Sequence, residues 1–526
     1  MPTTLPIPTS DFRLRLPQDG PLLGFTRWSE KSDAVVATVF ATPDDSESDP
    51  ALALFASYFN AAGKRQFAGA LKAYHPQDPD MSAPYFVINV QIPAEDFVNG
   101  AIRLEVLTLH KILAKGEIFT LPGDDELKDS KKARIDYDEL RTTLSTRLQK
   151  NQAMLIDPQP TSRSFENRSN RTLDEAIVTV RLPPKTGETK DFKFIANTCR
   201  YPGFAFESKR VDAASFDAIA EKHGDASGML MLGDQIYADA TASLFDNLTS
   251  IEKFQERYHK MFRSPGFAKA VRSIPCYMTG DDHEFSDSWS VPDDLLKPLL
   301  HAAAQQSYGV YQLSHSPFKG ALGTPPYDYF FTSGPVAVYV MDTLSYRNTQ
   351  VPGKEVIVSA EQLTAFEKWL TDLKRFDYVI LATGAVVAPG FQMAVDAVGK
   401  TDVSRAQGLE NWQAFNNQRI ELLNILSATK KKILLVSGDY HFAAIASIKT
   451  KDGTVIAKAV VVPPAYAPMK YVNAAPATVA EKEVTGDYEI TLTRAKDTKQ
   501  GSGFAVITIE NSEWVVKFET QLVADT

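Results

Sequence analysis

The chain has 526 residues, of which 56 are basic and 65 acidic, so its formal net charge is -9. That length is enough for two or three domains with large cores, and the acidic balance excludes a global electrostatic footprint for nucleic acid or anionic membrane. Only two cysteines occur, Cys199 and Cys276, which excludes a disulfide framework.

The N-terminus predicts no export signal. Met1 to Pro6 contains no basic stretch, and no long apolar core follows it. The apolar run from Tyr378 to Val398 is interrupted by glycine, proline and aspartate, so it does not predict a membrane span. We therefore expect a soluble, cytoplasmic protein.

The first third of the sequence predicts a β-rich or α+β domain. Ala34 to Phe40 and Tyr85 to Val90 have the β-branched and aromatic composition of strands, whereas Leu52 to Tyr74 has a helical pattern. Polar and charged residues then dominate from Gly123 to Asn170, with a proline-containing segment at Asp157 to Ser162 that is typical of a linker. We place the domain boundary near residue 165, with an N-terminal domain and linker over 1–165 and a second domain over 166–526.

Beyond this boundary, short apolar runs alternate with helix-like segments, which favours α/β layers. The predicted helices are Glu361 to Lys374 and Trp412 to Lys430. The predicted strands are Ala176 to Leu182, Phe192 to Ala196, Gly228 to Leu232, Val336 to Met341, Tyr378 to Ala382, Lys432 to Val436, Ala443 to Lys449, Thr454 to Val462, Asp487 to Thr493 and Gly503 to Ile509. The later strands indicate a mixed sheet.

Two of the apolar runs end in Gly-Asp, at Asp234 and Asp439, and the acidic cluster Asp281-Asp282-His283-Glu284 lies between them. A buried strand followed by Gly-Asp delivers a carboxylate to its C-terminal edge, where open α/β sheets place their ligand crevices. One such motif alone is commonly an ordinary turn. Their joint occurrence predicts a divided metal site.

The donors in and around these motifs suit two different cations. Hard cations prefer oxygen ligands, whereas thiolate and imidazole favour transition metals. A carboxylate can bridge two cations about 4 Å apart, which then clamp a phosphoryl group and lower the pKa of bound water enough to form a hydroxide nucleophile. The candidate donors are Cys199, Asp234, Tyr237, Asp282, Asp439 and His441.

Four short segments in this order resemble the alkaline phosphatase D (PhoD-like) family of metallophosphoesterases. They are Asn197 to Pro202, Leu232 to Asp239, Asp281 to Glu284 and Ser437 to His441. The likeness extends over roughly residues 190 to 445. It implies a four-layer α/β/β/α metallophosphoesterase-like core behind the N-terminal domain, with a mixed centre of ferric iron and calcium.

The resemblance also implies a role for each site residue. The ligands of the iron and its neighbours would be Cys199, Asp234, Tyr237, Asp439 and His441, with Asp234 as the bridge. Asp282 would contact the second metal, and His283 would bind the phosphate or protonate the leaving group. Arg200, and more distantly Arg347, would bind phosphate oxygens with planar guanidinium donors. Independently of the resemblance, we expect Asp281, Glu284 and Asp287 to orient the ligands, because acidic groups beside a metal site commonly fix the tautomers of its histidines.

The leading hypothesis is a metal-dependent hydrolase of phosphate monoesters, diesters or both, with metal-bound hydroxide as nucleophile and His283 assisting departure of the alcohol. A two-carboxylate glycosidase would not need Cys199, Tyr237 and His441 together. A metal-stabilised binding or structural protein without turnover remains an alternative, because Leu344 stands where the family often has arginine and Thr383 to Pro389 contains no histidine. The alcohol part of the substrate and the oligomeric state stay open.

Overall fold

The structure is a computed structural model of the whole chain. It describes residues 12–44, 51–73, 84–111, 173–185, 192–201, 213–238, 250–287, 289–290, 297–348, 355–390, 411–467, 479–496 and 501–522. The chain divides into two compact units, of which unit 1 comprises Met1–Leu23, Ser29–Tyr74 and Pro84–Leu182, and unit 2 the remainder. The predicted boundary at residue 165 lies outside the described residues.

Unit 1 is β-rich, as predicted. Its first sheet has the order β1-β7-β4-β5, with β8 paired to β7, and its second has the order β2-β3-β6, although the last residues of β2 belong to unit 2. The strands of the first sheet are β1 (Phe12–Arg15), β7 (Ala101–Lys111), β4 (Ala51–Phe59), β5 (Arg65–Leu71) and β8 (Ile177–Arg181), and those of the second are β2 (Asp19–Trp28), β3 (Ala34–Thr42) and β6 (Phe86–Pro93). Two short 3₁₀ helices are η1 (Ala94–Asp96) and η3 (Leu173–Ala176).

The helix predicted from Leu52 to Tyr74 is wrong, because this segment forms the antiparallel hairpin of β4 and β5. Every β4 residue from Ala51 to Tyr58 is buried, so the strand lacks the polar alternation of a half-buried strand. A short apolar run buried on both faces cannot be distinguished from a helix by periodicity. The turn that reverses the chain has Gly63 at φ 72°, in the left-handed region that glycine adopts readily.

Unit 2 contains two larger sheets. The six-stranded sheet has the order β11-β10-β9-β21-β22, with β18 paired to β9, and the eight-stranded sheet has the order β12-β13-β14-β15-β17-β16-β20-β19. The strands of the first are β9 (Lys193–Arg200), β10 (Gly228–Leu232), β11 (Cys276–Thr279), β18 (Pro464–Tyr466), β21 (Gly501–Glu510) and β22 (Glu513–Leu522). Those of the second are β12 (Tyr329–Ser333), β13 (Val336–Met341), β14 (Tyr378–Thr383), β15 (Lys432–Ser437), β16 (Ala443–Thr450), β17 (Val455–Val461), β19 (Lys482–Thr485) and β20 (Tyr488–Lys496).

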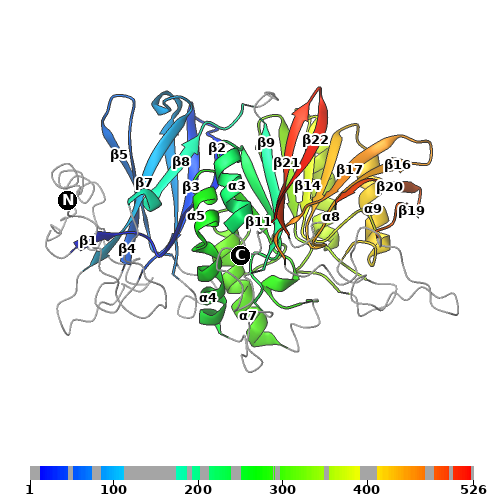
Figure 1. Cartoon of the computed structure of the whole chain (residues 1–526), viewed down its shortest axis with the longest axis horizontal. Helices are drawn as coiled ribbons and strands as arrows, with labels where there is room; N and C mark the ends of the chain where they lie inside the picture. Colours follow the sequence, from blue (N-terminus) through cyan, green and yellow to red (C-terminus); the bar gives the residue numbers. More distant parts are fainter. Residues whose placement is uncertain are drawn as a thin grey trace. The chain divides into compact units, whose positions relative to one another are not determined.

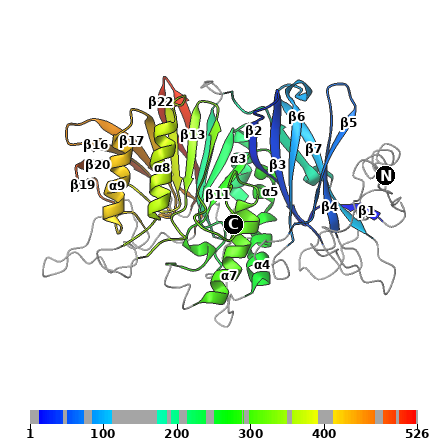
Figure 2. The same ribbon diagram turned by 180° about the vertical axis from the view of Figure 1, so that it is seen from behind.

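These sheets pack face to face, and helices cover them. One buried cluster joins Ala196 and Leu230 of the six-stranded sheet to Ile380 and Val436 of the eight-stranded sheet. A second cluster packs α8 (Ala360–Asp372) and α9 (Asn416–Ser427) on the opposite face of the eight-stranded sheet, as Figure 2 shows.

On the other side of unit 2, α3 (Ala213–His223) contacts β21 and β22 (Figure 1). The remaining helices are α4 (Ile251–Phe262), α5 (Pro265–Val271), α7 (Pro298–Tyr308), the 3₁₀ helix η4 (Asp282–Glu284) and the π-helix η5 (Gly309–Leu313). The predicted α/β/β/α layering is confirmed. Among the helices described here, none is long and apolar enough to cross a membrane.

The two sheets of unit 2 meet closely at the ends of β10 and β15. A Cβ atom built on Gly438 would lie 2.3 Å from the Leu232 carbonyl oxygen and 2.4 Å from Thr198 Oγ1. A Cβ atom on Gly233 would lie 2.4 Å from Asp281 Cβ. The glycines of both Gly-Asp motifs are therefore required by close backbone approach, which brings the following aspartates to one edge.

We expect Gly438→Ala to destabilise the protein by about 2 kcal/mol or more, because the added methyl group can be accommodated only by moving backbone. Denaturant unfolding of the variant beside the parent measures the change. Gly453→Ala is the matched control for alanine introduction, since nothing lies within 4 Å of a Cβ atom at Gly453, although its φ of +89° adds a local strain of its own. If Gly438→Ala destabilised the protein no more than Gly453→Ala, the close approach of Gly438 to Leu232 and Thr198 would be contradicted.

Candidate metal centre

The predicted site residues follow strands that end at one edge of the two sheets. Cys199 is the last residue but one of β9, Asp234 follows β10, and Asp282 follows β11. These three strands pair in parallel, so their carboxyl ends lie together. Asp439 and His441 follow β15 of the facing sheet.

Four candidate ligands have left-handed backbone conformations that residues other than glycine rarely adopt. The φ angles are 50° at Cys199, 55° at Asp234, 67° at Asp439 and 53° at His441. Such a conformation costs on the order of 1–3 kcal/mol per residue and is kept only where the surrounding structure enforces it. The concentration of four such residues at the ends of these strands is typical of a functional site.

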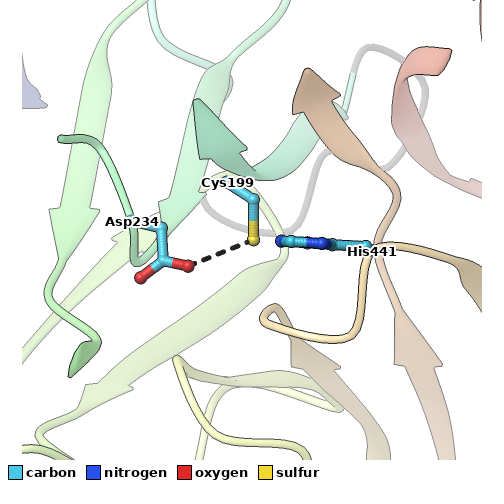
Figure 3. Close-up of side chains that lie close together, drawn as sticks. All are labelled: Cys199, Asp234 and His441. Atoms are coloured by element: carbon cyan, nitrogen blue, oxygen red, sulfur yellow. Dashed lines mark hydrogen bonds between the residues drawn. The ribbon is translucent and has the colours of Figure 1, made fainter. Parts of the chain in front are cut away.

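Cys199, Asp234 and His441 form one group of potential metal ligands, and their side chains point toward one another in Figure 3. One donor atom from each lies within 4.8 Å of the others. The Cys199 sulfur lies 3.4 Å from Asp234 Oδ2 and 3.7 Å from the Asp439 carbonyl oxygen, and its one thiol hydrogen can be donated to either. Sulfur, imidazole and carboxylate in one place suit a transition metal.

Asp234 also belongs to a second group, with Asp282 and His283, whose donor atoms likewise lie within 4.8 Å of one another. The Asp234 side chain is almost fully buried, and its Oδ1 atom has no hydrogen-bond partner. A buried carboxylate oxygen without a hydrogen-bond partner is costly unless a cation or water meets it. Two donor groups that share this carboxylate fit a pair of cations bridged by Asp234.

Tyr237 contacts residues of both groups. Its hydroxyl donates to Asp234 Oδ2 at 3.1 Å and lies 3.1 Å from His441 Nε2. Its ring packs on His283, with ring centroids 4.1 Å apart. Burial, together with the negative charges of Asp234 and Cys199, raises the pKa of the Tyr237 hydroxyl well above its ordinary value. A highly charged cation would be needed to bind the phenolate form.

Asp439 lies beside the first group, with its backbone nitrogen and oxygen in contact with Thr198 and Cys199. After burial and Asp234, its carboxylate is a further cause of the raised pKa of the Cys199 thiol. Among the described residues its carboxylate does not fall within either donor group. Its predicted role as a ligand stays a prediction.

Glu284 holds the Asp234 loop against the Asp282–His283 segment. Its carboxylate accepts hydrogen bonds from the backbone nitrogens of Asp234 at 2.9 Å, Gln235 at 2.6 Å and Asp281 at 2.8 Å. Gln312 Nε2 adds a fourth at 2.9 Å. The predicted orienting role of Glu284 therefore has a geometric basis. Sequence reasoning missed Gln312, because it lies on the π-helix η5 and no periodic pattern predicts that conformation.

The two arginines occupy buried positions. Arg347 forms an ion pair with Asp281 and donates from Nε to the Thr343 carbonyl oxygen, so it fixes the residue that caps η4. Arg200 has no exposed surface, packs over the Phe267 ring at 3.8 Å and donates to the Met261 carbonyl oxygen. These contacts favour packing and positioning, and the predicted phosphate contacts of both arginines stay predictions.

We expect the metal-free protein to lose stability as pH rises. Burial raises the pKa of Asp234 from its ordinary 3.8 to about 7 and that of Glu284 from 4.5 to about 8, with Asp234 as a further cause for Glu284. The native state then holds protons that the unfolded state releases, so this stabilisation is complete below the ordinary pKa values and is lost as pH rises through 7 and 8.

Denaturant unfolding of chelator-treated protein across this window measures the effect, which we expect to be on the order of a few kcal/mol. Asp234→Asn should flatten the curve, because it removes one of the two titrations. Metal affinity should rise over the same window, since bound carboxylates must be ionised. If the stability of the metal-free protein increased with pH instead, Asp234 and Glu284 would not be buried in their protonated form.

Comparisons with known proteins bear on the family and the fold of this chain. A sequence model of the family described as PhoD-like phosphatase matches residues 206–518, which is more than half of the chain. The match includes Asp234, Asp282, His283 and Asp439 but begins after Cys199. No curated protein matches the chain.

Among solved structures, one titled "Structure of PhoD" has a TM-score of 0.57 and 13% sequence identity, and the match covers 95% of this chain and 88% of that one. This likeness supports the fold. A calcium-binding mutant of Bacteroides uniformis beta-glucuronidase 2 has a TM-score of 0.21 at 8% identity, with 97% of this chain and 60% of that chain covered, and carries no argument.

Proposed function

The chain belongs to the PhoD-like phosphatase family, and from this membership we propose that it hydrolyses phosphate monoesters, diesters or both at the edge where the two sheets of unit 2 meet. Membership makes it a metal-dependent phosphoesterase whose substrates are phosphate esters. The observation that carries the proposal is that Asp234 belongs to both groups of potential metal ligands. A carboxylate shared by both groups can bridge two cations, and such a pair of cations can clamp a phosphoryl group.

The donor chemistry supports ferric iron in the first group and calcium in the second. Cys199 and His441 supply the softer sulfur and imidazole donors of the first group, and the Tyr237 hydroxyl lies 3.1 Å from both Asp234 Oδ2 and His441 Nε2. Asp282 adds a carboxylate to the second group, which suits a hard cation. When bound, the cations would neutralise charge on the phosphoryl oxygens and lower the pKa of an attacking water.

His283 is the proposed general acid. Its ring is held by packing on Tyr237, and Nε2 lies 3.8 Å from Asp287 Oδ1, while the His283 side chain retains 17% exposure. Water attacks phosphorus and releases one proton to solvent, the phosphorus–oxygen bond to the alcohol breaks, and His283 donates a proton to the departing oxygen.

Element-resolved metal content of the purified parent and of Cys199→Ala tests the centre. We expect iron with calcium in the parent, and at least about tenfold less iron retained by the variant. Cys276→Ala is the matched control, because Cys276 is buried in the core beside Met231 and belongs to neither donor group.

The same preparations should be assayed for release of alcohol from phosphate monoesters and diesters. A parent that binds metal and hydrolyses neither ester would favour the metal-stabilised binding protein. A parent that cannot be loaded with any metal would overturn the proposed centre.

A further inference from the structure

One hydroxyl group lies between the strand ends that carry the first group of ligands. Thr198 is on β9 and has no exposed surface. Its Oγ1 atom donates to the Leu232 carbonyl oxygen at 2.7 Å and accepts from the Asp439 backbone nitrogen at 3.3 Å. The first partner ends β10 of the six-stranded sheet, and the second follows β15 of the eight-stranded sheet.

The hydroxyl can satisfy both partners at once. A threonine hydroxyl has one hydrogen to donate and two lone pairs that accept. Leu232 takes the hydrogen, and the Asp439 nitrogen donates to a lone pair, while the neighbouring Cys199 sulfur lies 3.2 Å away. All four residues are buried, so removal of the hydroxyl would leave polar backbone groups without this partner in a region where water is largely excluded.

Backbone contacts explain why Thr198 Oγ1 can connect the two sheets. The end of β9 is already tied to the Asp234 loop, because Cys199 and Arg200 nitrogens donate to the carbonyl oxygens of Gly233 and Asp234 at 3.2 and 2.8 Å. Gly438 leaves no room for a side chain between Leu232 and Thr198. The Thr198 hydroxyl thus extends the β9–β10 connection across to the loop that carries His441.

We propose that Thr198 is a positioning residue of the metal centre, whose hydroxyl fixes the separation of the Asp234 loop and the Asp439–His441 loop so that Cys199, Asp234 and His441 meet around one cation. The inference rests on the proposed function. Ligand sets must be held within about 0.5 Å to bind a metal well. The left-handed backbone of Cys199, which follows Thr198, and of Asp439, which donates to the Thr198 hydroxyl, needs an enforcing contact of this kind.

The test compares Thr198→Val, which keeps the shape and removes the hydroxyl, with Thr198→Ser, which keeps the hydroxyl. Iron per chain, the rate of iron release to a chelator, the melting temperature, kcat and KM are measured for each. We expect Thr198→Val to release iron about 10 to 100 times faster, with kcat reduced and KM little changed, and Thr198→Ser to resemble the parent. Thr108→Val is the control, because Thr108 is equally buried but bonds the Arg15 carbonyl oxygen in unit 1.

Thr198→Val that retained iron and kcat within about twofold would overturn the inference. So would Thr198→Ser that lost iron as fast as Thr198→Val, because the methyl group would then be the important part. If Thr198→Val fails to fold, Thr198→Ala against Thr198→Ser gives the same comparison. A parent without metal or hydrolysis overturns the proposed function and this inference together, whereas an active parent with an active valine variant overturns only the inference.

Discussion

Asp234→Asn is expected to lose both cations and to reduce hydrolysis about a thousandfold or more, the rate equivalent of about 4 kcal/mol of transition-state stabilisation. Asparagine keeps the size of the side chain and one acceptor for the Tyr237 hydroxyl, but it removes the negative charge and the second oxygen. Both donor groups contain this carboxylate. A change at any other single ligand would directly affect only one group.

Metal content and kcat of the variant should be measured with its melting temperature, because removal of an acid that is costly to ionise can also stabilise the metal-free fold. Asp96→Asn is the matched control, since Asp96 is also buried and accepts hydrogen bonds from Tyr58 and the Ala61 nitrogen in unit 1. Retention of one equivalent of iron and full calcium by Asp234→Asn would rule out the bridge.

The strands and their ends were largely predictable from the sequence. The predicted runs at Gly228 to Leu232 and Val336 to Met341 coincide with β10 and β13, because parallel strands buried on both sides appear as uninterrupted apolar segments. Since side chains at the carboxyl ends of such strands share an edge, the meeting of Asp234 with Asp282 followed from the same pattern.

Contacts between elements were not predictable in this way. Arg200 follows Cys199 in the chain, but its guanidinium packs on the Phe267 ring, a contact with a distant helix that no local sequence pattern predicts. The hydrogen bond from Gln312 to Glu284 depends on a π-helix. In unit 1, burial of both faces of β4 concealed the hairpin. Each failure arises where tertiary packing decides a local conformation.

His283→Asn is expected to slow hydrolysis of alkyl phosphate esters about a hundredfold or more, but to slow hydrolysis of nitrophenyl esters far less. An alkoxide must be protonated as it leaves, whereas nitrophenolate is a stable anion that departs without a proton. The variant should keep its metal, if the main role of His283 is proton donation. His223→Asn is the control. His223 ends α3, pairs with Glu519 at 2.9 Å and belongs to neither donor group.

The dependence on leaving group separates the two roles that the position of His283 allows. As a general acid, His283 affects the two classes of ester unequally, and its loss leaves calcium bound. As a ligand of the group that it forms with Asp234 and Asp282, it supports the cation for every substrate, so its loss would lower calcium content and slow both ester classes by a similar factor. Equal slowing with loss of calcium would therefore assign His283 to the metal and leave protonation of the alcohol to another group.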